Sequence, residues 1–233
     1  MAPHYEELMS HVPYSMWVGY YQLLQAQLGV EHRRLLDVCC GTGTVAGILA
    51  SEGYQVTGVD LSADMISEAR RLRPEIEFHV ANAKDMDLGA RFEGAYSFFD
   101  SFNYITEPDD LRLAIEQVAR HLGPGGSLVF DMNTAYAFEK KMFDQKETRK
   151  SAPIRYDWVG EYDAGTKLIR VDMRFERNGA TFEEIHWQRA YETDEILGWL
   201  ELAGFGEVLV YDSYTLQPPR RKSDRLHFAA SLV

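Results

Sequence analysis

The segment from Leu35 to Gly43 places a carboxylate, Asp37, directly before a glycine turn. Residues 35–39 predict a buried strand, and the turn leads into a helix from Thr44 to about Ser51. A second strand at 55–59 ends in Asp60. A tight glycine turn lets a ligand approach the backbone closely, and an acid at the tip of the next strand suits a ribose diol. These features predict a pocket for an adenosine-bearing cofactor.

Two cofactors compete for this pocket. A nicotinamide site favours G-x-G-x-x-G, but here Gly41 and Gly43 are followed by Ala46 where the third glycine belongs. Asp37 would also repel a pyrophosphate, whereas it suits a ligand that carries an ammonium and a sulfonium group. S-adenosylmethionine (SAM) carries both, so the pattern favours SAM and leaves a nicotinamide oxidoreductase as a remote alternative.

The turn resembles motif I of the class I SAM-dependent methyltransferases, whose pattern is acid-x-Gly-x-Gly-x-Gly, with Cys39 standing at the first glycine. Later segments resemble the family's other motifs in the same order: 58–66 (GVDLSADMI), 78–86 (FHVANAKDM), 96–104 (YSFFDSFNY) and 122–131 (LGPGGSLVFD). The resemblance covers residues 13 to 133 well and the C-terminal hairpin moderately. It implies a methyltransferase of the small-molecule and amine branch that converts SAM to S-adenosylhomocysteine.

The resemblance also implies roles for single residues. Asp60 would hold the ribose, the region of Met65 would flank adenine, and Asn82, which replaces an aspartate of the family, would bond the adenine amino group through its amide oxygen. An N-terminal helix would cover the cofactor. The predicted cofactor-binding residues are Tyr14, Trp17, Asp37, Cys39, Cys40, Gly41, Gly43, Asp60, Leu61, Met65, Asn82, Ala83 and Asp100.

Methyl transfer from a sulfonium is an in-line displacement in which the protein mainly aligns the reactants. An amine must offer its lone pair, and a hydroxyl usually needs a stronger base or a metal. We therefore consider Asp100, Tyr104 and His186 as catalytic candidates, because a carboxylate or a base beside the acceptor helps. Asp100 has the alternative role of fixing the loop, and a lone strand histidine is more often structural. No His, Asp and Glu cluster has metal-ligand spacing, so no metal is predicted.

The core alternates strands near 35–39, 55–59, 76–80, 94–99 and 126–131 with helices near 44–51, 62–72 and 109–121. This alternation predicts parallel strands with right-handed crossovers and a ligand beyond their carboxyl ends. A helix capped by Thr193 and ended by Gly204 follows, and then strands at 207–212 and 225–231. By the resemblance, the fold is α/β: a doubly wound seven-stranded sheet in the order 3-2-1-4-5-7-6, with strand 7 antiparallel and an inserted antiparallel β-meander.

Four parts are predicted along the chain. They are a helical cap (1–33, with a helix from Ser15 to Leu28), a SAM-binding Rossmann-like core (34–133), a substrate-covering helix and meander (134–192), and a C-terminal helix and hairpin that complete the core (193–233). The insertion predicts a helix at 134–144 and three strands, with Asn178-Gly179 as a hairpin turn.

The last strand of the insertion has two unlike faces. Glu184, His186 and Gln188 share one face, and Ile185 and Trp187 lie on the other. The sequence does not decide which face meets the substrate, and a dimer interface is the alternative role for the meander.

The composition of the chain limits the classes of partner that it is expected to bind. The net charge of −12 disfavours nucleic acid, whose binders usually present a basic face. No apolar run is long enough to span a membrane, and residues 1–30 hold no Lys or Arg, which excludes an ordinary signal peptide. The two cysteines are adjacent, so no disulfide framework is expected, which fits a reducing cytoplasm. We expect a small-molecule partner and a monomer or homodimer.

Three functions remain open. The first is SAM-dependent methyl transfer to a nitrogen or oxygen of a small molecule. The second is methylation of RNA or protein. The third is a non-catalytic SAM-binding regulatory module.

Overall fold

A central sheet of seven strands organises the chain in the computed structural model, which describes residues 2–9, 12–149, 152, 154–177 and 179–233. The sheet order is β10-β11-β5-β4-β1-β2-β3. Its strands are β1 (Arg34–Val38), β2 (Gln55–Asp60), β3 (Glu77–Val80), β4 (Phe92–Ser97), β5 (Leu122–Asn133), β10 (Phe205–Asp212) and β11 (Arg225–Leu232). β11 runs antiparallel to both β5 and β10, whereas the other pairs are parallel. The predicted α/β fold and strand order are therefore confirmed.

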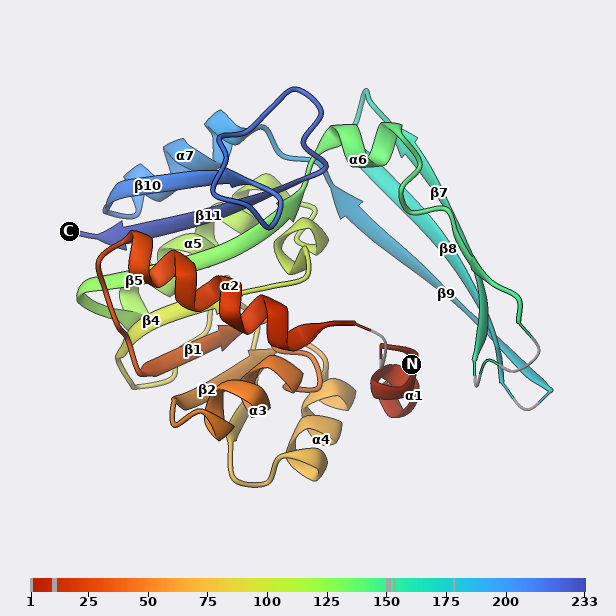
Figure 1. Ribbon diagram of the computed structural model, residues 1–233, viewed down its shortest axis with the longest axis horizontal. Helices are drawn as coiled ribbons and strands as arrows, with labels where there is room; N and C mark the ends of the chain where they lie inside the picture. The colour runs from red at the N-terminus through yellow and green to blue at the C-terminus, as the bar shows by residue number, and fades with distance from the viewer. Residues whose placement is uncertain (1, 10–11, 150–151, 153, 178) are drawn as a thin grey trace.

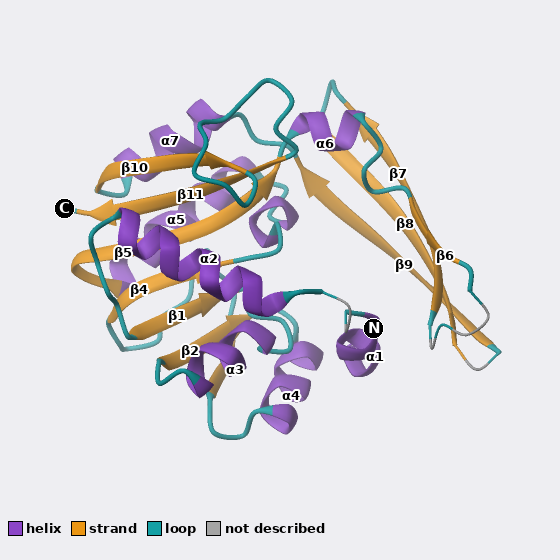
Figure 2. Cartoon of the chain, in the orientation of Figure 1, coloured by secondary structure: helices purple, strands orange, loops and turns teal. Residues whose placement is uncertain are grey.

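Helices cover both faces of this sheet (Figures 1 and 2). One buried cluster joins the sheet to α2 (Tyr14–Gln27), α3 (Thr44–Ser51) and α4 (Ala63–Leu72), and another joins it to α5 (Pro108–His121) and α7 (Thr193–Leu202). Trp17, Tyr21 and Leu24 recur at helical spacing in α2 and are all buried. Within the described residues, no helix combines the length and apolarity needed to cross a bilayer.

The helix ends follow from local capping. Ser62 caps α4 by accepting a hydrogen bond from the Met65 amide. For α7 the prediction was wrong by one residue, because Glu192 and not Thr193 is the N-cap. Glu192 forms a capping box with Glu195, so each carboxylate accepts a backbone N–H at the helix start.

The insertion forms a second sheet that stands apart from the first (Figure 2). The insertion comprises α6 (Ala135–Glu139) and the four strands of this sheet. Their order is β6-β7-β8-β9: β6 (Gln145–Glu147), β7 (Arg155–Asp163), β8 (Leu168–Arg177) and β9 (Ala180–Arg189). The predicted helix at 134–144 was too long. Lys141 takes a left-handed conformation, and the chain then pairs with β7 as an additional strand. The predicted turn at Asn178-Gly179 includes Asn178, which lies outside the described residues.

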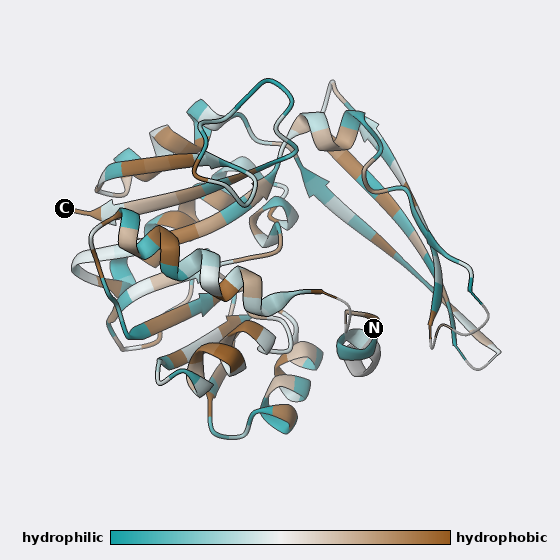
Figure 3. Cartoon of the chain, viewed as in Figure 1, coloured by the Kyte–Doolittle hydropathy of each residue, from teal (hydrophilic) through white to brown (hydrophobic). Residues whose placement is uncertain are grey.

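Register decides which face of the second sheet is covered. Val171 and Met173 of β8 are buried and lie opposite His186 and Glu184 of β9. The polar face of β9 is therefore the inner one, and Ile185 and Trp187 point outward. Figure 3 shows the mainly hydrophilic colouring of β9.

A short helix that was not predicted, α1 (Ala2–Leu8), lies between the core and the second sheet (Figure 1). Leu8 and Met9 are buried in a cluster with side chains of the insertion, including Phe138 and Val171. These contacts explain why so short a helix forms, because most helical stability comes from packing rather than from intrinsic propensity.

Candidate active site

A cavity of about 630 Å³ lies beyond the carboxyl ends of the parallel strands, where such sheets bind ligands. Segments from α1, α2, the first sheet and the insertion line it together. The predicted residues that it gathers are Tyr14, Trp17, Asp37, Cys39, Cys40, Gly41, Asp60, Leu61, Met65, Asn82, Ala83, Asp100, Tyr104 and His186. Of the predicted set, Gly43 alone does not line the cavity.

The conformation of the glycine turn explains why Gly43 does not line the cavity. Gly41 and Gly43 have φ of 55° and 79°, a left-handed conformation in which glycine carries no Cβ penalty. A Cβ on Gly43 would lie 2.5 Å from Cζ of Phe78, so this glycine lets the turn pack against β3. Cys39 also takes positive φ (62°), at the position where the family pattern has its first glycine.

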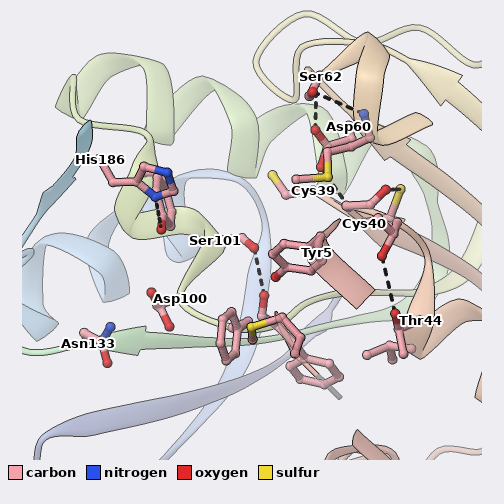
Figure 4. A pocket seen from close by; sticks show the side chains of 18 of the residues that line it. Tyr5, Cys39, Cys40, Thr44, Asp60, Ser62, Asp100, Ser101, Asn133 and His186 are labelled. Carbon is pink, nitrogen blue, oxygen red and sulfur yellow. Dashed lines mark hydrogen bonds between the residues drawn. The ribbon is translucent and has the colours of Figure 1, made fainter. Parts of the chain in front are cut away.

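Asp60, at the end of β2, ties two loops together. Its Oδ2 accepts the Gly41 amide at 2.8 Å, and its Oδ1 accepts the Ser62 amide at 2.9 Å. Figure 4 shows Asp60 beside Ser62 at the rim of the pocket. Each carboxylate oxygen keeps a further lone pair. Burial raises the pKa of Asp60 although the two amides oppose the shift. The group is therefore an oriented acceptor suited to ribose hydroxyls.

Asp37 lies deeper, with 4% of its surface exposed. Burial raises the pKa of this carboxyl to about 8, against the opposing hydrogen bond from Tyr96 and with a further increase from nearby Asp60. A nearby cation stabilises the ionised form of a buried carboxyl whose pKa is raised in this way. It therefore suits the ammonium of a ligand that enters beside the glycine turn.

The adenine end of the predicted site is less enclosed. Leu61 is exposed and Met65 is half-buried at the start of α4. Asn82 follows β3, and its Oδ1 accepts the Lys84 amide at 3.3 Å, which orients the side-chain amide. These side chains offer an apolar surface with one polar group, as an adenine ring requires.

Helix α1, which does not belong to the first sheet, covers one side of the cavity. Oε1 of Glu6 accepts the hydroxyls of Thr42 and Thr44, each at 2.7 Å, and pairs with Arg73 at 3.3 Å. Burial opposes ionisation of Glu6, but the two hydroxyls and Arg73 outweigh it and lower the pKa of the carboxyl. The neighbouring Tyr5 ring lines the cavity (Figure 4).

A buried ion network forms the floor of the cavity. Asp131, at the end of β5, accepts the Phe99 and Asp100 amides at 2.8 and 3.0 Å. Both residues have positive φ, so Asp131 stabilises a backbone conformation that is otherwise unfavourable. Arg225 of β11 pairs with Asp131 and, at 2.8 Å, with Asp100. The Asp100 side chain also accepts Nε2 of Gln188 at 2.6 Å.

On the insertion side, three side chains form a hydrogen-bonded chain. Tyr104, in the 3₁₀ turn η1 (Ser101–Tyr104), lies with its Oη 3.0 Å from Nδ1 of His186. Nε2 of His186 lies 3.0 Å from Oε2 of Glu184. Burial raises the pKa of the Tyr104 hydroxyl, and the charge of Asp100 adds to the increase. The two predicted candidates, Tyr104 and His186, are therefore in contact.

The sequence reasoning missed several residues of the site. Asp131 lies near the end of the apolar strand β5 and was detectable by the same strand-end rule that found Asp60. Glu184 was placed on the same strand face as His186 but was given no role. Tyr5, Glu6 and Arg225 had no local signal, because their positions depend on how distant segments pack.

Comparison with known proteins places the chain in a family. Residues 35–126 match a family model described as a methyltransferase domain. A putative methyltransferase of Geobacillus sp. (strain WCH70) is 31% identical over 97% of this chain and 96% of its own length. YqeM, a putative methyltransferase of Bacillus subtilis (strain 168), is 32% identical over 97% and 93%. The chain belongs to the SAM-dependent methyltransferases.

Solved structures agree on the fold of this methyltransferase. A SAM-dependent methyltransferase from Clostridium acetobutylicum ATCC 824 superposes with a TM-score of 0.85, at 23% identity over 98% of this chain and 96% of that one. Streptomyces venezuelae DesVI gives 0.80, at 22% identity over 97% and 94%. A partial relative, the dTDP-3-amino-3,6-dideoxy-α-D-glucopyranose N,N-dimethyltransferase of Streptomyces fradiae, is 38% identical over 66% of this chain and 55% of its own length.

SAM is the cofactor of this methyltransferase, and the residues present fit it. The cavity has a buried carboxyl that could hold the ammonium, an oriented carboxylate that could hold the ribose and an apolar surface that could hold adenine.

Proposed function

We propose that the enzyme transfers the methyl group of SAM to the nitrogen of a small-molecule amine. The observation that carries this proposal is the shared cavity, which holds the predicted cofactor residues on one wall and the insertion on the other. Its volume of about 630 Å³ falls within the range of small-molecule sites, roughly 300–1,000 Å³.

In this proposal the predicted site residues have separate roles. Asp60 and Asp37 hold the ribose and ammonium of SAM, with Cys39, Cys40 and Gly41 forming the turn around its methionine part. Bound SAM supplies a methyl group already activated on sulfur. The chain's own residues then orient the acceptor and exclude water, and α1 covers the reacting atoms. Asp100 shapes the floor of the cavity, because its carboxylate already bonds Gln188 and Arg225.

The cavity wall formed by the insertion favours an acceptor that is partly apolar and carries a proton to be removed. Trp158, Phe143 and Met173 line it together with the hydrogen-bonded pair Tyr104 and His186. The nitrogen atom is favoured over oxygen by the partial relative that is named as an amino-sugar N,N-dimethyltransferase. Similarity over part of the chain supports this class of acceptor and not that particular sugar.

The test is methyl transfer from labelled SAM to separated acceptor pools. One pool holds the small molecules of a cell extract, supplemented with glycine and dTDP-3-amino-3,6-dideoxy-α-D-glucopyranose as defined amines. The other holds RNA and protein. We expect label in the small-molecule pool, and none with Asp60→Ala. Label confined to macromolecules would overturn the proposal, and tight SAM binding without label in either pool would favour a binding module.

A further inference from the structure

The chain formed by Tyr104, His186 and Glu184 has a defined direction. An ionised carboxylate such as Glu184 only accepts hydrogen bonds, so the proton of the neutral imidazole must lie on Nε2, 3.0 Å away. Nδ1 is then left as an acceptor, and the Tyr104 hydroxyl at 3.0 Å must donate to it. Glu184 thus fixes the tautomer of His186, and the tautomer fixes the direction of the tyrosine hydroxyl.

With its hydrogen donated to His186, Tyr104 Oη keeps one acceptor lone pair besides the one that the Gln188 side chain contacts. Tyr104 and His186 both line the cavity, and 43% of the Tyr104 surface is exposed. An acceptor N–H that enters the cavity can donate to Oη while the tyrosine donates to His186. The geometry has the form of a two-step proton route.

Resting on the proposed methyl transfer to an amine, we propose that Glu184 is a positioning residue that sets up a proton route from the acceptor through Tyr104 to His186. The N–H bond of an incoming ammonium breaks, and its proton goes to Tyr104 Oη while the tyrosine's own proton goes to His186 Nδ1. The electron pair stays on nitrogen and attacks the methyl carbon as the C–S bond breaks onto sulfur. The imidazolium faces Glu184 and later returns its proton to solvent.

The surroundings favour this route over a charged tyrosine. Burial and the charge of Asp100 raise the pKa of the Tyr104 hydroxyl, so Tyr104 serves better as a neutral relay than as a tyrosinate. The charge of Arg225 offsets that of Asp100, and Glu184 and Tyr5 of α1 are further titratable groups near Tyr104. From β8, the partners opposite His186 and Glu184 are the apolar Val171 and Met173.

The chain provides a matched control. Glu183 precedes Glu184 on β9, but it lies on the outer, exposed face of the strand. Glu184→Gln and Glu183→Gln therefore make the same chemical change one residue apart, on opposite faces of one sheet. Only the first alters the partner of His186, because a glutamine amide can donate to Nε2 and allow the other tautomer.

The first measurement needs no acceptor. Imidazole ¹⁵N NMR of the full chain saturated with S-adenosylhomocysteine reports which nitrogen of His186 carries the proton. We expect the Nε2–H form in the wild type and in Glu183→Gln, and a mixture or the Nδ1–H form in Glu184→Gln. An unchanged tautomer in Glu184→Gln would overturn the positioning role, whether or not the proposed function holds.

The second measurement uses whichever of the two defined amines accepts label. We expect Glu184→Gln to lower kcat roughly tenfold or more at neutral pH and to move the acidic limb of the pH–rate profile to lower pH, with SAM affinity unchanged. Glu183→Gln should match the wild type, and Glu184→Asp should recover part of kcat. Equal loss of kcat and SAM affinity, or an unshifted pH profile, would contradict the route.

Discussion

At the scale of single residues, Asp60 has a structural role and, in the proposed function, also binds the ribose of SAM. Its carboxylate accepts the Gly41 and Ser62 amides and keeps acceptor capacity for the ribose. Hydrogen bonds to a charged group contribute about 1.5–3 kcal/mol each. We therefore expect Asp60→Ala to weaken SAM binding on the order of 100-fold or more by calorimetry, because two ribose bonds are lost. Asp64→Asn, an exposed change four residues along, should bind normally. Unchanged affinity of Asp60→Ala would disprove this placement of the ribose.

Asp37 makes the stability of the ligand-free enzyme depend on pH. Its pKa is raised from 3.8 to about 8 in the folded state, so between these values the folded chain holds a proton that the unfolded chain has released. The stabilisation is complete below the unfolded pKa and is lost as pH rises through about 8. Without SAM, we expect the free energy of unfolding to fall less from pH 5 to pH 8 in Asp37→Asn than in the wild type, measured by urea titration. Parallel pH profiles would argue against a protonated Asp37.

At the scale of secondary structure, α1 joins two parts of the enzyme through adjacent acids. Glu6 bonds the turn residues Thr42 and Thr44, whereas Glu7 pairs with Arg177 of β8 at 2.7 Å. Because the Glu6 bonds hold α1 over the cofactor side of the cavity, we expect Glu6→Gln to speed SAM dissociation on the order of tenfold, since charge-assisted bonds become neutral ones. Stopped-flow release of SAM measures this rate. Glu7→Gln, which makes the bond to Arg177 of the insertion a neutral one, should have the smaller effect. The reverse ranking would show that α1 does not hold SAM through the turn.

At the scale of the whole molecule, Arg225 links the last strand to the floor of the cavity. It pairs with Asp100 and Asp131 and is separated from them by about half the chain. Removing one partner of a buried ion pair leaves an uncompensated charge, which costs about 3–5 kcal/mol. We expect Arg225→Met to lower the free energy of unfolding by about this amount in urea titration, and Arg225→Lys to lower it less. A loss below about 1 kcal/mol for Arg225→Met would show that solvent already screens the network.

Local sequence pattern predicts a parallel α/β sheet and the edge of that sheet at which a ligand would bind, whereas the strand order comes from the resemblance to the methyltransferase motifs. Alternating apolar strands and helices predict parallel strands with right-handed crossovers, and residues such as Asp37 and Asp60 come at strand ends, which local pattern alone reveals. Tertiary structure decided what closes the site. The register of β9 against β8 turned His186 and Glu184 inward, and the packing of Leu8 and Met9 put α1 over the cavity. Such choices depend on contacts between segments far apart in the chain, whose energies no local pattern encodes.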